Sequence, residues 1–407
     1  MQDVKFNYQN ISVSFDGNTA IVKNKNLFVN TDTFDCIISY EKDGKEYKKD
    51  KCSVSVAPLS EGSIELADYA MEDAGIYTVT VSFCLKEDTC WAKAGHEVAF
   101  GQTKKVVEAK AVTSVTPAKV TIGEYNVGVK GDSFEVMFSR VAGGMVSYCY
   151  GGVERIKAIP KPNFWRAPTD NDYGNSMPQR YAQWKLASMY CSHKKPETQE
   201  TMMPDIVEEN GGVRVTYTYL LPTTPEHTCE VSYFVNGDGE VTTRMTMDPV
   251  AELGDAPEFG MMFKLDADLC YLEWLGLGPA ETYADRKEGA KFGRYRNEVK
   301  DNMAEYMVPQ ECGNKMDVYE AKVTDRKGRG LLFKGKGMNF SALPYTPHEL
   351  ENAAHAYELP KVHYTVVRAA MAQMGVSGDD SWGAKTHPEY LLPADKKLVF
   401  EFSFKGV

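Results

Sequence analysis

The stretch Val213-Arg214-Val215-Thr216-Tyr217 places an apolar side chain at every second position, and this pattern recurs along most of the chain. The alternation is seen again in residues 11–15, 77–81, 240–245 and 398–402, with turn-forming residues between the runs. Because successive side chains of a strand point to opposite faces of a sheet, each run predicts a strand with one buried and one solvated face. Such strands are typical of antiparallel sheets stacked as sandwiches, so we expect an all-β protein.

Helical periodicity is rare in this sequence. Its best instance is residues 178–190, where Pro178 stands near a first helical turn and apolar side chains follow at helical spacing. A second, shorter helix is predicted to begin at Thr346-Pro347. The helices are therefore expected to be additions to a β framework.

The strand-like runs and turns divide the chain into three parts. Residues 1–105 carry short strands at regular spacing, which favours an immunoglobulin-like β-sandwich. Residues 106–117, poor in aromatics, are expected to form a linker, and residues 118–407 one large β domain. Segments 163–177 and 374–388 interrupt the strand rhythm of that domain. Loops of this length in a compact domain are more often functional than decorative.

Composition limits the classes of partner. The chain has 407 residues, 43% of them hydrophobic and 25% charged, which suits a soluble protein of two or three domains. The formal net charge of −11 would repel a polyanion, so we expect no nucleic-acid partner. Neither an 18-residue apolar run nor a signal-peptide pattern is present, which favours no membrane association. The compartment is left open between cytoplasm and periplasm.

The cysteines are scattered and odd in number. There are nine of them, and no C-x-x-C spacing occurs, so neither a disulfide scaffold nor a structural zinc site is expected. Cys84 and Cys90 are the closest pair and could bridge a hairpin, a question that spacing alone leaves open. We expect most of the thiols to be buried among apolar side chains.

Acidic side chains concentrate at Asp170-Asn171-Asp172, at Glu281 and at Asp379-Asp380. Cleavage of a glycosidic bond normally needs two carboxyl groups at a fixed separation. The chain has 57 Asp and Glu residues, so abundance alone decides nothing. For each concentration, a carboxylate that caps a turn or pairs with a nearby arginine is the better explanation.

Trp382 lies in a Gly- and Ser-rich segment, residues 375–383, and not on an alternating strand. Sugars present apolar C–H faces that stack on a flat aromatic ring, and the neighbouring carboxylates could bind hydroxyl groups. The indole is therefore either a binding platform for a sugar or a core residue folded under the loop, and the residues alone do not choose between these two roles.

Four segments carry a family resemblance. Residues 164–174, Phe-Trp-Arg-Ala-Pro-Thr-Asp-Asn-Asp-Tyr-Gly, resemble the F-x-R-A-P-x-D-N-D motif of family 2 β-galactosidases. Residues 276–286 are similar to the G-x-G-P-x-E-x-Y-x-D-R signature of the same C-terminal domain, and residues 375–382 resemble its G-x-x-G-D-D-S-W loop. Residues 91–96 resemble the W-x-x-A-G-H segment of the preceding sandwich. The four matches occur in family order and together are highly specific.

The resemblance implies an immunoglobulin-like domain followed by a β-supersandwich of the galactose-mutarotase-like kind. It places the catalytic glutamates, Mg²⁺ and Na⁺ in an upstream (β/α)₈ barrel, and no alternation of strands and helices typical of a barrel occurs here. We therefore expect no catalytic residue, metal or cofactor in this chain, and no activity from it alone. The resemblance implies two partners: a β-galactoside, contacted on its leaving-group side, and the barrel of the full-length enzyme. It is also compatible with a full-length enzyme that forms a homo-oligomer.

The resemblance also assigns site residues. Trp382 matches the tryptophan that stacks on the sugar at the leaving-group side, and Asp172 to Pro178 matches a mobile loop beside the same pocket, with Gly174 as a hinge. Asp379 and Asp380 belong to the adjoining loop. Glu281 is not catalytic by the same logic.

Two other functions are alternatives to the hypothesis that this chain forms a non-catalytic side of a β-galactosidase pocket. An autonomous carbohydrate-binding module would show measurable sugar affinity in isolation. An aldose mutarotase would need a His and a Glu that converge on the concave face of the sheet, and His227, His355 and His363 lie in or near strand-like runs. The natural sugar, the linkage and the oligomeric state do not follow from the sequence.

Overall fold

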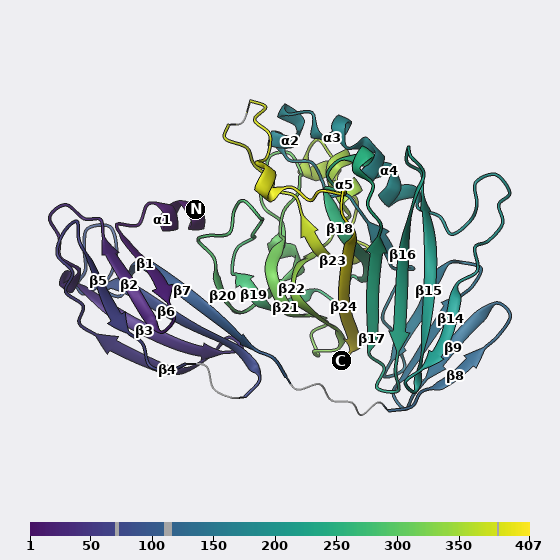
Figure 1. Cartoon of the computed structure of the whole chain (residues 1–407), viewed down its shortest axis with the longest axis horizontal. Helices are drawn as coiled ribbons and strands as arrows, with labels where there is room; N and C mark the ends of the chain where they lie inside the picture. Colours follow the sequence, from purple (N-terminus) through teal and green to yellow (C-terminus); the bar gives the residue numbers. More distant parts are fainter. Residues whose placement is uncertain (70–72, 110–115, 381) are drawn as a thin grey trace. The chain divides into compact units, whose positions relative to one another are not determined.

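The computed structural model describes residues 1–69, 73–109, 116–380 and 382–407. They form two compact units (Figure 1), which are described separately. The first comprises Met1–Thr113, Leu277–Ala280 and Arg286–Arg294, and the second comprises Ser114–Gly276, Glu281–Asp285 and Tyr295–Val407. The predicted division into consecutive domains could not have assigned Leu277–Ala280 and Arg286–Arg294 to the first unit. The centre of the predicted linker, residues 110–115, lies outside the described residues.

The first unit is a sandwich of two antiparallel sheets. Its elements are α1 (Gln2–Asn7), β1 (Ile11–Asp16), β2 (Thr19–Asn24), η1 (Thr31–Thr33), β3 (Phe34–Lys42), β4 (Lys45–Cys52), β5 (Glu61–Glu65), β6 (Gly75–Leu85) and β7 (Glu97–Val107). One sheet has the order β1-β2-β5 and the other β4-β3-β6-β7. The inner strand β6 buries Val79, Val81 and Phe83 completely. Thr78 and Thr80 on its other face are buried as well, whereas the alternation around residues 77–81 predicts a solvated face there.

The second unit contains the remaining strands. They are β8 (Lys119–Ile122), β9 (Asn126–Lys130), β10 (Phe134–Ser139), β11 (Gly144–Tyr150), β12 (Val153–Glu154), β13 (Lys161–Asn163), β14 (Asp205–Glu209), β15 (Gly212–Leu221), β16 (His227–Val235), β17 (Val241–Met247), β18 (Glu258–Asp266), β19 (Tyr271–Gly278), β20 (Lys291–Glu298), β21 (Lys315–Thr324), β22 (Gly330–Leu343), β23 (Tyr364–Gln373) and β24 (Leu398–Gly406). β19 and β20 also contribute residues to the first unit. β8 to β12 form a five-stranded sheet, and the others form a twelve-stranded sheet.

The stretch that predicted the fold lies on β15, in the large sheet. Val213, Val215 and Tyr217 are buried there, and the residues between them are only partly buried. The strand pairs antiparallel with β16, so that Val215 faces Tyr233 and Tyr217 faces Val231. Each of these cross-strand pairs lies on the buried face, which fixes the register because a one-residue slip would expose it.

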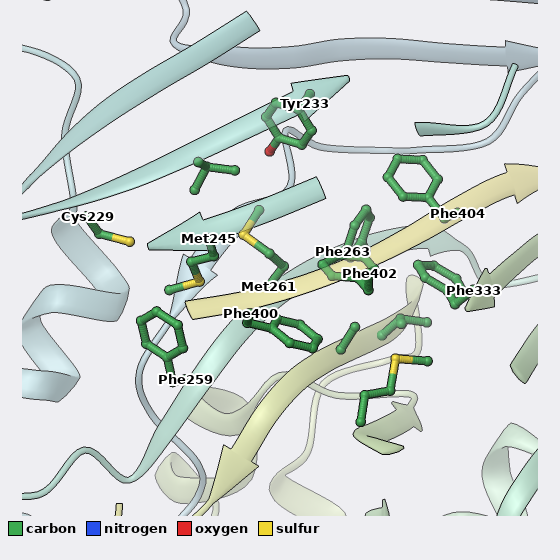
Figure 2. Close-up of a cluster of buried hydrophobic side chains, with 14 of the residues drawn as sticks. Cys229, Tyr233, Met245, Phe259, Met261, Phe263, Phe333, Phe400, Phe402 and Phe404 are labelled. Atoms are coloured by element: carbon green, nitrogen blue, oxygen red, sulfur yellow. The ribbon is translucent and has the colours of Figure 1, made fainter. Parts of the chain in front are cut away.

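Aromatic rings from several strands of the large sheet fill the core (Figure 2). Phe263 on β18 makes edge-to-face contacts with Phe333 on β22 and Phe404 on β24, each with 5.3 Å between ring centroids. All three side chains are at most 1% exposed. The apolar positions of strands far apart in the sequence therefore meet in one continuous core.

The helices are short. They are α2 (Asp170–Gly174), α3 (Met177–Arg180), α4 (Ala182–Tyr190) and α5 (Pro347–Asn352), with 3-10 turns η2 (Ala251–Leu253), η3 (Val299–Asn302), η4 (Ala356–Glu358) and η5 (Pro388–Tyr390). The predicted helix 178–190 is interrupted at Tyr181, whose φ of −115° and ψ of 19° are not helical. Its hydroxyl donates to Asp255 over 2.7 Å, which ties the interruption to another segment.

The second predicted helix is α5, and Thr346 and Glu349 form a capping box at its start. With both units built from antiparallel sheets and only short helices added, the predicted fold class is confirmed: an immunoglobulin-like sandwich is followed by a large antiparallel β-supersandwich.

Candidate functional site

Trp382 is presented at the surface of the second unit, where its side chain is 87% exposed. Its backbone N–H donates to Asp380 Oδ1 over 2.8 Å, and the N–H of Ala384 donates to the same oxygen over 3.2 Å. The Asp380 carboxylate thus holds the backbone turn that carries the indole. A tryptophan this exposed fills no core, so the structure does not support the role of a core residue folded under the loop.

Asp379, the neighbour of Asp380, pairs with His387 at the other side of the same segment. Its Oδ1 lies 2.9 Å from His387 Nε2. The hydrogen bond to Asp379, with a smaller contribution from the charge of Glu389, raises the pKa of His387. Both side chains are exposed. Asp379 and Asp380 therefore shape the loop around Trp382, and both remain accessible to solvent.

The base of this loop is clamped by two other segments of the chain. Asp285 Oδ2 accepts a hydrogen bond of 2.8 Å from the N–H of Ser377. Arg166 Nη2 donates to the carbonyl of Gly375 over 2.8 Å. A Cβ atom at Gly375 would lie 2.5 Å from Asp285 Oδ2, so only glycine allows this close approach. We call Arg166, Asp285 and the Gly375–Ser377 backbone the loop clamp.

Arg166 is itself held by Asp172, and this ion pair is buried. The two side chains are 0% and 2% exposed, and Arg166 Nη1 lies 2.5 Å from Asp172 Oδ2. Asp172 Oδ2 also accepts from the N–H and the hydroxyl of Thr169 in a capping box at α2. The Thr169 hydroxyl, which has a single proton to share, also lies 3.2 Å from the carbonyl oxygen of Val376. Asp172 therefore holds Arg166 of the loop clamp in place, and its buried carboxylate is not available to a ligand.

The expected role of Gly174 as a hinge concerns motion of the loop and stays a prediction. Gly174 is the last residue of α2, and its φ is not left-handed. The unusual conformation occurs two residues later, at Ser176, whose φ of 59° and ψ of 32° are left-handed. α2 does lie beside the Trp382 loop, because a Cβ atom at Gly383 would be 3.0 Å from the carbonyl oxygen of Gly174.

Glu281 has a structural environment. Its Oε1 accepts from the Tyr306 hydroxyl over 2.9 Å, and its Oε2 accepts from the N–H of Gly313 over 2.7 Å. Both carboxylate oxygens thus hold the segment that precedes β21. This geometry gives no indication of a catalytic acid or nucleophile.

A buried charged cluster was missed from the sequence. Arg368 on β23 donates to Glu258 Oε2 over 2.7 Å and to Glu311 Oε1 over 2.5 Å, and all three are at most 2% exposed. Asn163 donates to the other oxygen of Glu258 over 2.6 Å. Burial raises the pKa of Glu258 to about 7. The available signal was an arginine inside the otherwise apolar run 366–372, because an unpaired charge is rarely buried.

A second buried cation lies on β21. Lys315 is 2% exposed, and its ammonium group lies 4.9 Å from the centre of the Trp274 ring. Burial lowers its pKa to about 8. A buried lysine with a lowered pKa is a candidate catalytic group in general. Here the charge of the partly buried Glu281 opposes the shift of the Lys315 pKa, and Lys315 itself is enclosed by the protein.

Within the described ranges, no three His, Cys, Asp or Glu side chains gather to hold a metal ion. Two of the three histidines named for a mutarotase, His227 and His355, have local roles. His227 bonds the carbonyl of Asp248, and His355 pairs with Glu358 in the exposed turn η4. Neither arrangement brings a His and a Glu together on a sheet. No helix in the described part of the chain is long and apolar enough to cross a membrane.

Comparisons with known proteins agree with the arrangement of these motifs. The family model for the β-galactosidase small chain matches residues 130–405, and the model for β-galactosidase domain 4 matches residues 20–105. A β-galactosidase of Halalkalibacterium halodurans is 39% identical over 418 residues, which cover 100% of this chain and 40% of that protein. The β-galactosidase small subunit of Latilactobacillus sakei is 36% identical over 312 residues, 70% of this chain and 97% of that subunit.

Among solved structures, a galactose 1-epimerase of Lactobacillus acidophilus covers 72% of this chain and 99% of its own, with a TM-score of 0.40 and 8% identity. The family models and the sequence relatives define the chain as a component of a β-galactosidase. More particularly, the chain belongs to the β-galactosidase small-chain family and corresponds to a C-terminal part of such enzymes. It spans about 40% of the length of the H. halodurans relative.

Proposed function

We propose that this chain is the non-catalytic C-terminal part of a family 2 β-galactosidase that hydrolyses terminal β-D-galactosides. In this role it completes the leaving-group side of the pocket with Trp382 and braces the catalytic barrel. The acid/base and nucleophile glutamates, Mg²⁺ and Na⁺ would belong to that barrel. The proposal is supported by relatives named β-galactosidase and by a separate small-subunit relative, which implies a larger catalytic partner.

The observation that carries the proposal is an exposed indole on an anchored loop. Apolar side chains stabilise a fold through the area that they bury. A tryptophan that is 87% exposed therefore contributes little to the stability of this loop. Here the loop clamp fixes the base of the loop at Gly375 and Ser377, and the ring is exposed to solvent. A pre-positioned aromatic ring binds a sugar face at a lower entropic cost than a mobile one.

The clamp also explains why three family motifs meet. Arg166 comes from the first motif, Asp285 from the second and Gly375 from the third, and their hydrogen bonds join them within one unit. None of these groups needs to touch the substrate. They would set the position of Trp382, and through it the choice between water and a second sugar as the acceptor.

The test uses the complete β-galactosidase that contains this chain. Trp382→Ala should weaken glucose as acceptor and disaccharide as substrate by about 1–2 kcal/mol in apparent binding. Hydrolysis of an aryl galactoside, whose leaving group needs less help, should fall less. Trp382→Phe keeps a stacking face and is the matched control. An equal loss on both substrates would contradict the assignment of Trp382 to the leaving-group side.

The isolated chain provides a second test. It should not turn over a chromogenic β-galactoside, and activity abolished by Glu281→Gln would show that the active site had been misplaced. It should also bind simple sugars weakly, because one stacking contact contributes about 1 kcal/mol, whereas millimolar affinity requires about 4 kcal/mol. Micromolar binding by calorimetry would favour an autonomous carbohydrate-binding module instead.

A further inference from the structure

Two cysteines that the sequence separates by fifteen residues lie opposite each other in the first unit. Cys36 on β3 and Cys52 at the end of β4 are direct partners in the antiparallel register. Both are free thiols. The pair that is closest in sequence is arranged differently, because Cys84 on β6 is opposite Asp35 and Cys90 is exposed in a turn.

The register places the two thiols on the same face of the sheet. Directly opposed residues of antiparallel strands have Cα atoms about 4.5–5.5 Å apart, within the roughly 4.4–6.8 Å that a disulfide spans. Cys36 is 1% exposed, and the partly buried Cys52 packs against the same apolar core. Burial, followed by a hydrogen bond with the Cys52 thiol, raises the pKa of Cys36. The two sulfur atoms are therefore neighbours.

We propose that Cys36 and Cys52 form a cross-strand disulfide site that is oxidised by small disulfides of the glutathione class. The partly exposed Cys52 loses its proton, and its thiolate attacks one sulfur of the small disulfide and releases one small thiolate. The Cys36 thiolate then attacks the Cys52 sulfur of the mixed disulfide and releases the second. Two protein thiols are oxidised, one small disulfide is reduced to two thiols, and the cysteine protons pass to them.

The location gives the bond a structural effect. β4 is an edge strand in the order β4-β3-β6-β7, and most of its residues are exposed. A disulfide at its last residue would join this edge strand covalently to β3, an interior strand of the sheet. The bond would close a short loop around the β3–β4 hairpin, which stabilises the folded state mainly by restricting the unfolded one.

Peptide mapping of the whole chain tests the site. The protein is incubated at pH 8 with oxidised glutathione, alkylated and digested without reduction by trypsin together with a glutamate-specific protease. Five lysines lie between the two cysteines, and Glu61 and Glu65 separate Cys52 from Cys84, so a linked peptide identifies its partners. We expect a Cys36–Cys52 peptide that disappears on reduction, and a fall from nine free thiols to seven once mixed disulfides at other sites are subtracted.

Variants sharpen the result. Cys52→Ser should abolish the linked peptide, whereas Cys90→Ser should leave it unchanged. Because the pKa of Cys36 is raised, the second step should be slow and should accelerate as the pH rises from 7 to 9. Oxidation should also raise the melting temperature of the first unit by several degrees in wild type but not in Cys52→Ser.

Two outcomes would overturn the proposal. One is that Cys90 accepts glutathione under these conditions while no Cys36–Cys52 peptide forms at any pH up to 9. The other is that the linked peptides join Cys36 or Cys52 to Cys84, which the register places on the opposite face.

Discussion

Two acidic segments of the second unit, Asp170–Asp172 and Asp379–Asp380, have similar composition, but Asp172 and Asp379 within them have opposite environments. Asp172 is 2% exposed and pairs with a fully buried arginine. Asp379 is 79% exposed and pairs with a half-exposed histidine. Both segments border the same loop, yet the first supports it from inside and the second shapes its surface. A carboxylate therefore acquires its role from what covers it, and the segments that cover Asp172 are distant in sequence.

The largest difference should appear when each aspartate is removed. Asp172→Ala leaves the buried Arg166 without its counter-ion, and breaking a buried pair in this way costs about 3–5 kcal/mol of unfolding free energy. Asp379→Ala removes an exposed pair and should change stability by less than about 1 kcal/mol. Urea unfolding of both variants measures the difference. Similar costs for the two would mean that Asp172 is hydrated in solution.

The buried cluster should also make stability depend on pH. The pKa of Glu258 is about 7 in the folded protein against an ordinary value of 4.5. Because the folded pKa is raised, the contribution of Glu258 to stability is complete below about pH 4.5 and is lost as the pH rises through 7. Relative to Glu258→Gln, wild type should therefore lose on the order of 2 kcal/mol over this range.

Glu258→Gln is a suitable reference because Arg368 keeps its second partner, Glu311. Urea unfolding at pH 4.5, 6 and 7.5 in both proteins separates this group from all other carboxylates. A constant difference between the two proteins would mean that Glu258 stays ionised throughout and that Arg368 offsets its burial.

At the exposed segment 379–380, the effect to measure is a shift in the pKa of His387 and not a change in stability. The hydrogen bond to Asp379 raises the pKa of His387, so Asp379→Asn should lower that pKa when it is followed by NMR. Any contribution to stability would be present at low pH and lost as the pH rises through the raised pKa. His348, whose pKa is lowered mainly by burial, is the control and should not respond. An unchanged pKa of His387 would mean that the pair does not form in solution.

The sequence predicted the parts of the molecule that depend on local patterning. Alternation located the strands, such as β15, because a half-buried strand imposes a period of two on its own residues. The capping box at Thr346 and Glu349 is likewise local. The family motifs identified the loop that carries Trp382, although its role as a platform stays a prediction.

Contacts between distant segments could not be predicted in this way. Arg368 is 110 residues from Glu258 and 57 residues from Glu311 in the sequence, and only the folded sheet brings the three together. The same holds for Cys36 and Cys52: sequence spacing identified only Cys84 and Cys90 as the closest pair and left their bridging open. The hinge at Gly174 stays a prediction; the left-handed backbone of this segment is at Ser176, because glycine permits such angles but does not require them.

The smallest expected effect on stability is that of truncating Trp382. It gives the most direct comparison between the exposed loop and the buried residues beneath it. Trp382→Ala removes a ring that is 87% exposed, so it creates no cavity, and the melting temperature should change by less than about 2 °C. Trp165 is the matched control, because it lies in the first family motif, is 0% exposed and donates to Glu351 over 2.9 Å. Trp165→Ala should cost about 3–5 kcal/mol. Thermal melting of the three proteins, with no barrel present, makes the comparison. A fall of ten degrees or more for Trp382→Ala would show that the ring packs against the protein in solution, and its assignment as a sugar platform would have to be withdrawn.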